Sequence, residues 1–275
     1  MARQMICRRF SRALGILSIL VFLIAASSPE SSRVYRILGP GSGPPPGAKD
    51  SYTLEELEAF GVQTVESSYF DRAMNYQDTR LRVVSLARLA ETLYPGGEVD
   101  ALALNCFDDY QGIVSLEDVK RYDLRLATGI EVLPRFKKPG WLNPLLIVVP
   151  DGSGAPYQER FMTANIRELR FVRLEDYYAP LREIGQGNPA LREGMEAFKD
   201  NCLFCHSVKG IGGNKGVRLL TAYDFSRAPD RERFKADFAS FHGKDNPDKQ
   251  NVQQFVTGTM LEKIIRFLAA PSLSS

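Results

Sequence analysis

The chain has 275 residues, of which 44% are hydrophobic and 25% are charged. This length allows two domains with separate cores, and this composition excludes a fibrous, collagen-like or wholly disordered protein. The 35 basic and 33 acidic residues nearly balance, which argues against a nucleic-acid partner.

Residues 1–28 have the order of charge and hydropathy that is typical of a secretory signal peptide. An uncharged run of 14 residues, Ala13 to Ala26, leads into small residues. Four basic residues precede this run: Arg3, Arg8, Arg9 and Arg12. A spanning helix needs about 20 apolar residues, so a run of 14 is short for a membrane anchor. We therefore expect a signal for export to the periplasm, or to the outer face of the inner membrane, of a bacterium. An uncleaved leader that anchors the chain is the alternative, and only then do we expect membrane contact.

Residues 29–50 contain the Pro/Gly-rich run 39–49 and are expected to form a tether before the folded part. Residues 51–184 follow as an α+β domain with a mainly β core. Its helices should begin at capping residues, and its strands are apolar or alternating runs. The helices start at Thr53, Ser85 and Ser115, and the strands cover 101–106, 124–133, 145–149 and 168–174.

After Gly185 the pattern becomes helical or irregular, with no clear strand. Asn188 is a favourable N-cap, and Pro189 occupies the first helical position, where proline is tolerated. We therefore place a domain boundary near 182–188 and expect residues 188–275 to form a second, all-α domain.

The segment Cys202-Leu203-Phe204-Cys205-His206 has the spacing of covalent haem attachment. Two thiols at this spacing can add to the two haem vinyl groups as thioethers, and the adjacent His206 can bind the iron as the proximal ligand. The predicted cofactor is one covalently bound haem c per chain. The predicted export agrees with this, because c-type haem is attached outside the cytoplasm.

Two other uses of this cysteine pair are less favourable. A structural zinc ion needs four ligands, and only Cys106 and His242 remain to complete the set. A thioredoxin-like dithiol opens a helix after a strand, whereas Cys202 and Cys205 close a predicted helix.

Residues 188–270 resemble the class I cytochromes c. Gly194, Phe198 and Cys202 follow one another at intervals of four residues, and this pattern is similar to the first helix of that family. Residues 261–268, with Phe267, are similar to its closing helix. The resemblance implies an all-α cytochrome c domain in which Gly194 allows these two helices to approach closely.

The chain departs from that family at two places that concern the iron. Val217 stands where the family usually has a proline, which would support the carbonyl group that accepts a hydrogen bond from His206. The family also usually has a distal methionine in the loop before the last helix, and residues 243–254 contain none. The distal ligand therefore has to be sought elsewhere.

The first candidate distal ligand is His242, which ends a predicted helix with an aromatic stripe. A surface histidine that interacts with the helix dipole is the alternative interpretation. Met260, on the closing helix, is the second candidate, and packing in the core is the alternative for this residue. Asn246, Asn251 or an open iron remain as further alternatives.

Part of the N-terminal domain is similar to the later half of the molybdopterin-binding domain of sulfite-oxidase-like oxidoreductases. The similarity lies in the order of five segments: 106–110, 114–116, 124–128, 139–140 and 145–150. Asp109 replaces a glycine of that pattern, and residues 29–105 contain no cysteine that could bind molybdenum. Cys106 ends a predicted strand, where a buried thiol is expected. The resemblance implies a reduced fold without the metal chemistry.

Two classes of function remain open. The preferred prediction is a monohaem protein that transfers single electrons between periplasmic redox partners, with an N-terminal docking domain and no catalytic residue assigned. The alternative is a small oxidoreductase, or a subunit of one, whose N-terminal domain binds a molybdopterin-like cofactor or a substrate and passes electrons to the haem. Four lysines are candidates for docking around the haem edge: Lys209, Lys215, Lys244 and Lys249.

Overall fold

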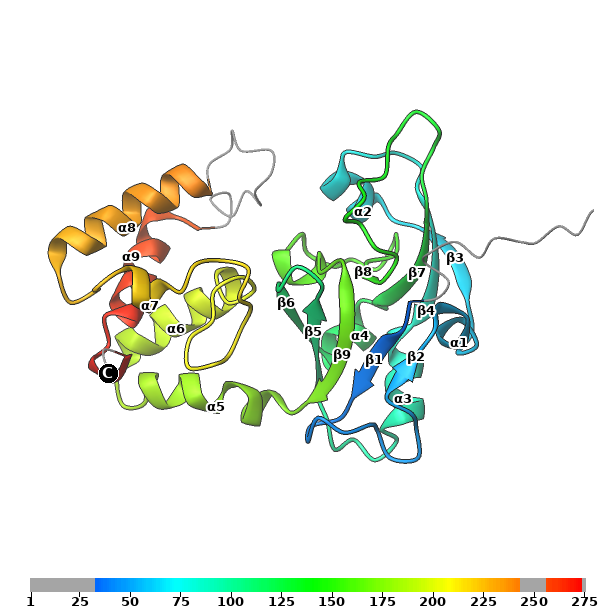
Figure 1. Cartoon of the computed structure of the whole chain (residues 1–275), viewed down its shortest axis with the longest axis horizontal. Coiled ribbons are helices and arrows are strands. Elements are labelled where there is room, and N and C mark those ends of the chain that lie inside the picture. Colours follow the sequence, from blue (N-terminus) through cyan, green and yellow to red (C-terminus); the bar gives the residue numbers. More distant parts are fainter. Residues whose placement is uncertain (1–32, 243–255, 274–275) are drawn as a thin grey trace, which may run out of the picture.

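The computed structural model describes residues 33–242 and 256–273. The predicted signal peptide and the candidates Asn246 and Asn251 lie outside these residues. Figure 1 shows the β-sheets on one side of the molecule and the C-terminal helices on the other. In this described part of the chain, no helix is both long and apolar enough to cross a membrane.

The larger sheet has five strands in the order β2-β1-β9-β5-β6. Its strands are β1 (Tyr35–Leu38), β2 (Ser51–Tyr52), β5 (Ala101–Cys106), β6 (Gln111–Ser115) and β9 (Ile166–Val172). The strand β1 runs parallel to β9, with Ile37 opposite Leu169, and the other neighbours are antiparallel. Segments that are far apart in the sequence therefore lie side by side in this sheet.

The smaller sheet has four antiparallel strands in the order β3-β4-β7-β8. Its strands are β3 (Gln63–Glu66), β4 (Arg80–Ser85), β7 (Arg125–Glu131) and β8 (Leu146–Val148). The four predicted strands are confirmed, because they overlap β5, β7, β8 and β9. The remaining strands were not predicted.

Four helices accompany the sheets, and their starts are set by capping side chains. They are α1 (Leu54–Glu58), α2 (Ser68–Met74), α3 (Leu86–Leu93) and α4 (Leu116–Arg121). Thr53 forms a capping box with Glu56: the Thr53 N–H donates to Glu56 Oε2 at 2.8 Å, and the Glu56 N–H donates to Thr53 Oγ1 at 3.3 Å. Ser85 and Ser115 cap α3 and α4. The three predicted helix starts are confirmed.

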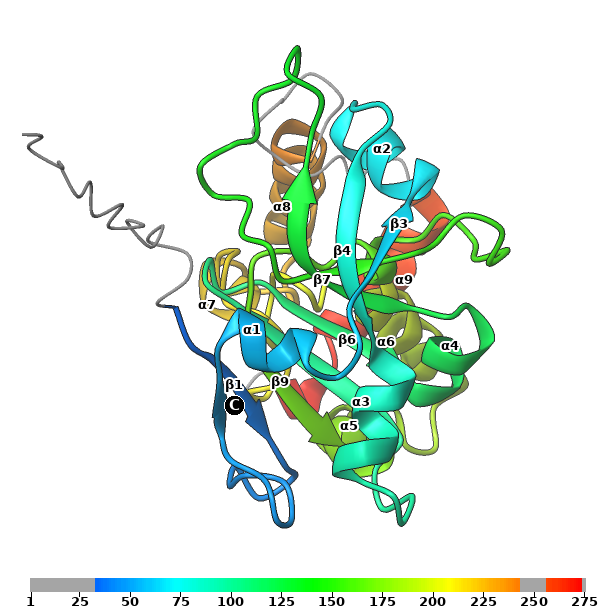
Figure 2. The ribbon, with the colours of Figure 1, turned by 90° about the vertical axis from the view of Figure 1, so that its right-hand side faces the viewer.

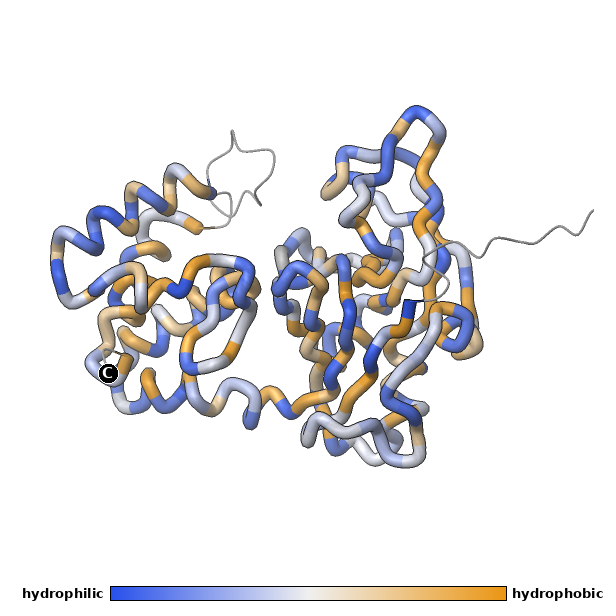
Figure 3. The backbone as a smooth tube through the Cα atoms, in the orientation of Figure 1, coloured by the Kyte–Doolittle hydropathy of each residue, from blue (hydrophilic) through white to orange (hydrophobic). Residues whose placement is uncertain are grey.

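The main core lies between the two sheets and α3. Leu102, Leu104 and Cys106 enter it from one face of β5, because alternate residues of a strand share a face. Leu126 of β7 and Ile147 of β8 meet them from the smaller sheet. Figure 2 shows β4 and β7 above the strands β1 and β9, and Figure 3 shows hydrophobic residues alternating with hydrophilic ones along the strands.

Part of the predicted tether belongs to this core. Tyr35 and Ile37 of β1 are fully buried in it. The Pro/Gly run forms the connection from β1 to β2, where the Gly39 N–H donates to the Gly43 carbonyl at 2.7 Å. The strand is too short for a clear alternating pattern, and its pairing with β9 stabilises it.

In residues 174–242 and 256–273 the structure has five helices, with a 3-10 turn (Pro271–Leu273) after the last. They are α5 (Leu174–Gly185), α6 (Pro189–Asn201), α7 (Leu219–Ala222), α8 (Ala228–Phe241) and α9 (Gly258–Leu268). The helices α6 and α9 touch at Gly194, where a Cβ would lie 2.1 Å from the Lys263 carbonyl oxygen. The Phe198 and Phe267 rings pack there with centroids 5.6 Å apart. The close approach predicted for Gly194 is confirmed.

The prediction of an α+β domain followed by a separate all-α cytochrome c domain is wrong. The described residues form an α+β structure with two sheets, and the C-terminal helices are not set apart as a clear all-α domain. Phe204, which lies between Cys202 and Cys205, is 4% exposed and belongs to the core of the sheets. Val208 and Ile211 form a β-bridge. Helical periodicity reports local structure only, and it cannot show which core a loop residue joins.

Candidate metal centre

The predicted haem-attachment motif begins where α6 ends. Cys202 is the C-cap of α6, and its N–H donates to the Phe198 carbonyl at 2.8 Å. The N–H groups of Cys205 and His206 both donate to the Cys202 carbonyl, at 3.1 and 2.9 Å. The motif therefore forms one tight turn with two half-buried cysteines. This turn brings the thiols and the imidazole into one neighbourhood, as covalent haem attachment requires.

A glycine-containing loop, residues 210–216, packs against this turn. The Gly213 N–H donates to the Leu203 carbonyl and the Gly216 N–H donates to the Cys205 carbonyl, each at 2.8 Å. A Cβ on Gly216 would lie 2.2 Å from Cε1 of His206, so a larger residue would displace the ring. The loop therefore confines the His206 imidazole from one side.

The hydrogen bonding of His206 leaves one ring nitrogen for a metal. Its Nδ1 lies 2.8 Å from the Val217 carbonyl oxygen. Because a carbonyl can only accept, Nδ1 carries the proton and Nε2 presents its lone pair. Burial lowers the pKa of His206 below its ordinary value, although the bond to Val217 opposes this. The ring is therefore neutral at pH 7, which is the form that binds a metal.

The structure brings His242 next to His206. His242 is the C-cap of α8, and its N–H donates to the Phe238 carbonyl at 3.0 Å. The centroids of the two imidazole rings are 6.3 Å apart, and their planes make an angle of 88°. A metal–imidazole bond of about 2.0 Å places two rings on opposite sides of one ion with centroids about 6 Å apart. The observed separation of 6.3 Å would allow both imidazoles to bind a single metal ion.

Met260 lies in the first turn of α9, where its N–H donates to Thr257 Oγ1 at 3.2 Å. Its half-buried side chain packs against the apolar cluster of the C-terminal helices. This environment favours the packing role over the ligand role for Met260. Between the two candidates, the geometry therefore favours His242.

The cysteines do not have the surroundings of a zinc site or of a redox-active dithiol. In residues 33–242 and 256–273, no three side chains of His, Cys, Asp or Glu converge as metal ligands. Burial raises the pKa of Cys202 to about 12 and also raises the pKa of Cys106. A reactive or zinc-binding cysteine needs an accessible thiolate. These surroundings therefore favour neither zinc binding nor dithiol redox chemistry for the pair.

Large apolar side chains lie exposed close to the two histidines in the sequence. Val217, whose carbonyl binds His206, is 60% exposed, and Phe241, which precedes His242, is 52% exposed. Leu220 at the start of α7 is 36% exposed. Exposed apolar side chains of this kind are available to contact a bound apolar group.

The larger sheet also contacts this centre, through the turn between β5 and β6. The Tyr110 and Phe204 rings are stacked with centroids 5.6 Å apart and an angle of 8° between their planes. The Gln111 N–H donates to the Phe204 carbonyl at 2.8 Å, and Lys215 Nζ donates to Asp108 Oδ2 at 2.7 Å. Sequence reasoning missed these contacts. In the sequence, the only indication of such a contact was the large aromatic residue Phe204 inside the motif.

Two features of the N-terminal part, Cys106 and an apolar cavity, do not fit a molybdopterin site. Cys106 is fully buried in the core, where it cannot reach a metal–pterin cofactor at a surface cleft. A cavity between α2 and β8, lined by apolar residues, has a volume of about 40 Å³. Ligand pockets usually begin at roughly 300 Å³, so this apolar cavity is too small for a cofactor. A second hollow, of about 460 Å³, reaches that size, and it is lined by Thr64, Val65, Glu66, Arg80, Pro150 and Asp151.

Comparison of the chain with protein-family models gave no match, and a search of curated proteins gave no significant match. Function is therefore inferred from the residues of the candidate centre.

Proposed function

We propose that the chain is an exported c-type haem protein that transfers single electrons. In this proposal Cys202 and Cys205 would hold one haem c through thioether bonds, and the imidazoles of His206 and His242 would bind its iron. The observation that carries this proposal is the 6.3 Å separation of the two imidazole rings beside the cysteine pair.

A bound haem supplies an iron that changes its charge by one electron. The residues of the chain hold and tune that group. His206 presents Nε2, because Nδ1 donates to the Val217 carbonyl, and this bond raises the basicity of the ligand. Two imidazole ligands favour a lower reduction potential than a histidine–methionine pair. If both imidazoles bind the iron, they would leave it no free position for a substrate, and this favours electron transfer over catalysis.

The partner that fits this function is a periplasmic redox protein that acts as electron donor or acceptor. The leader supports this location, although residues 1–28 lie outside the described structure. Of the candidate docking lysines, Lys209 is exposed, whereas Lys215 is engaged with Asp108. Lys244 and Lys249 lie outside the described residues.

Covalent haem attachment tests the proposal directly. The full chain, with its leader, should be produced in a bacterial host that has a c-type haem maturation system. We expect the haem to stay with the polypeptide after acid denaturation, and the mass of the chain to rise by one haem. Cys202→Ala and Cys205→Ala should each remove one thioether bond, while Cys106→Ser, a matched control, should keep both. A purified chain without covalent haem would overturn the proposal.

Metal and pterin analysis of the same protein separates the second candidate function. A molybdopterin-containing oxidoreductase should contain one molybdenum per chain. The electron-transfer protein should contain iron alone, in a one-to-one ratio to the chain.

A further inference from the structure

We propose that the turn between β5 and β6, residues 107–110, is a brace that positions the Val217 carbonyl and, through it, the imidazole of His206. This inference rests on the proposed function, in which His206 is the proximal iron ligand. Asp108 and Lys215 are positioning residues in it, because they act on the imidazole through the loop.

The loop that carries Val217 has little rigidity of its own. Residues 209–217 include four glycines and no proline. Gly210 and Gly212 have φ values of +77° and +101°, which other residues rarely adopt. Glycine has the most conformational freedom to lose, and no proline fixes φ ahead of Val217. Contacts from outside the loop must therefore hold the carbonyl in place.

The turn supplies two such contacts, on adjacent residues of the loop. The Asn214 N–H donates to the Asp109 carbonyl at 2.9 Å, and Lys215 Nζ donates to Asp108 Oδ2 at 2.7 Å. Asp109 has a φ of +62°, a conformation that Asp tolerates better than most residues. Both anchors lie just before Val217 in the chain.

The same turn also holds the motif that carries His206. Tyr110 stacks on Phe204, and the Gln111 N–H donates to the Phe204 carbonyl at 2.8 Å. The donor of the bond from His206 to Val217 and its acceptor are therefore attached to one rigid element. Their relative position therefore depends on that element, in addition to the direct bonds that the Gly213 and Gly216 N–H groups donate to the Leu203 and Cys205 carbonyls.

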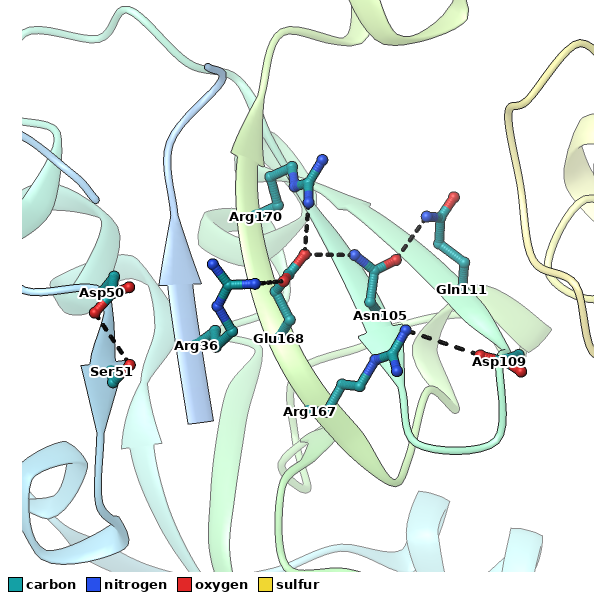
Figure 4. Close-up of polar contacts among 9 residues, drawn as sticks. All are labelled: Arg36, Asp50, Ser51, Asn105, Asp109, Gln111, Arg167, Glu168 and Arg170. Atoms are coloured by element: carbon teal, nitrogen blue, oxygen red, sulfur yellow. Dashed lines mark hydrogen bonds and ion pairs between the residues drawn. The ribbon is translucent and has the colours of Figure 1, made fainter. Parts of the chain in front are cut away.

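Side-chain bonds tie the turn to the neighbouring strand β9, as Figure 4 shows. Gln111 Nε2 donates to Asn105 Oδ1 at 2.6 Å, and Asn105 Nδ2 donates to Glu168 Oε1 at 2.7 Å. Arg167 and Asp109 form an ion pair at 3.8 Å. Glu168 is 7% exposed, so its bond with Asn105 is shielded from competing water, whereas the Arg167–Asp109 pair is exposed. The brace is thus part of the sheet.

Loss of the brace should weaken the bond between His206 and Val217. The imidazole then becomes a poorer electron donor to the iron, and the reduction potential rises. The loop should also open more often, so that its amide hydrogens exchange faster.

Two variants, Asp108→Asn and Lys215→Gln, test this in the full chain. In each, we expect amide exchange in residues 213–217 to be about two- to fivefold faster, as for the loss of one exposed ion pair. We also expect a higher reduction potential of the haem-loaded protein. The exchanged pair Asp108→Lys with Lys215→Asp should restore both values toward those of the wild type.

Lys263→Gln is the matched control. It breaks an ion pair of 3.0 Å between Lys263 of α9 and Glu193 of α6. Like Lys215→Gln, it removes one positive charge. The brace is wrong if the Asp108 and Lys215 variants match this control in both exchange and potential. If the wild-type chain takes no covalent haem, the proposed function fails, while the exchange measurement on the haem-free protein still tests the brace.

Discussion

The imidazole of His242 lies 6.3 Å, between ring centroids, from the imidazole of His206, with the two planes at 88°. His206 follows the end of α6, and His242 ends α8, so only the packing of the helices brings them together. Phe238, one turn before His242, packs on its ring with centroids 5.1 Å apart. This contact restrains the His242 imidazole at the end of its own helix.

Replacement of His242 by alanine should change the optical spectrum of the haem-loaded protein. Loss of the distal nitrogen converts a six-coordinate, low-spin iron to a high-spin iron. Met260→Leu, which conserves the volume of a side chain that packs in an apolar cluster, should leave the spectrum unchanged. Absorption spectra of the oxidised and reduced forms make the measurement. A low-spin spectrum that survives His242→Ala but is lost in Met260→Leu would assign the ligand to the methionine.

The contact of α6 with α9 predicts that Gly194→Ala destabilises the protein. The new Cβ would lie 2.1 Å from the Lys263 carbonyl oxygen and 2.8 Å from Cβ of Phe267, so the helices must separate. We expect a loss of about 1–3 kcal/mol in the free energy of unfolding, as for other overpacked contacts. Urea titration at pH 7 measures it.

Gly258→Ala is the control for this change. A Cβ on Gly258, also in α9, meets no atom within 4 Å. Since alanine is the better helix former, we expect a gain of up to about 1 kcal/mol. Equal effects of the two substitutions would contradict the close packing at Gly194.

The raised pKa of Tyr223 predicts that part of the free energy of unfolding is lost at alkaline pH. Burial, together with the hydrogen bond that its hydroxyl donates to Asp237 Oδ2 at 2.8 Å, raises the pKa of Tyr223 from 10.0 to about 12. The unfolded chain therefore releases this proton at a lower pH than the folded chain. This stabilisation is fully present below pH 10 and is lost as the pH rises toward 12.

Tyr223→Phe removes the titrating group and isolates its contribution. We expect the variant to be less stable at pH 8 by about 1 kcal/mol, the usual net value of one hydrogen bond. The difference from the wild type should shrink between pH 10 and pH 12. Urea unfolding of both proteins across this range gives the comparison, and a difference that stays constant with pH would refute the assignment.

Several local features of the fold were predictable from the sequence. The helix starts after Thr53, Ser85, Ser115 and Asn188 follow from side chains that cap their own backbone within three residues. The strand Ala101–Cys106 follows from an apolar run. The haem-attachment hypothesis is also local, because its chemistry depends on residues within one turn.

The errors have one origin. The parallel pairing of β1 with β9 turned part of a predicted tether into a buried strand. The stacking of Phe204 on Tyr110 joined the C-terminal helices to the sheets and ended the prediction of a separate all-α domain. Neither contact leaves a periodic signal, since each involves only a few residues whose partners are distant in the chain.

The residue types and spacings of the sequence established the motif, its caps and the list of candidate ligands. Only the tertiary structure decided that His242 lies beside His206, that Met260 packs in an apolar cluster, and that a turn of the sheet holds the loop of Val217. The physical reason is the distance along the sequence over which each interaction acts. Capping and periodicity act over a few residues, whereas these contacts depend on which distant apolar surfaces are buried together.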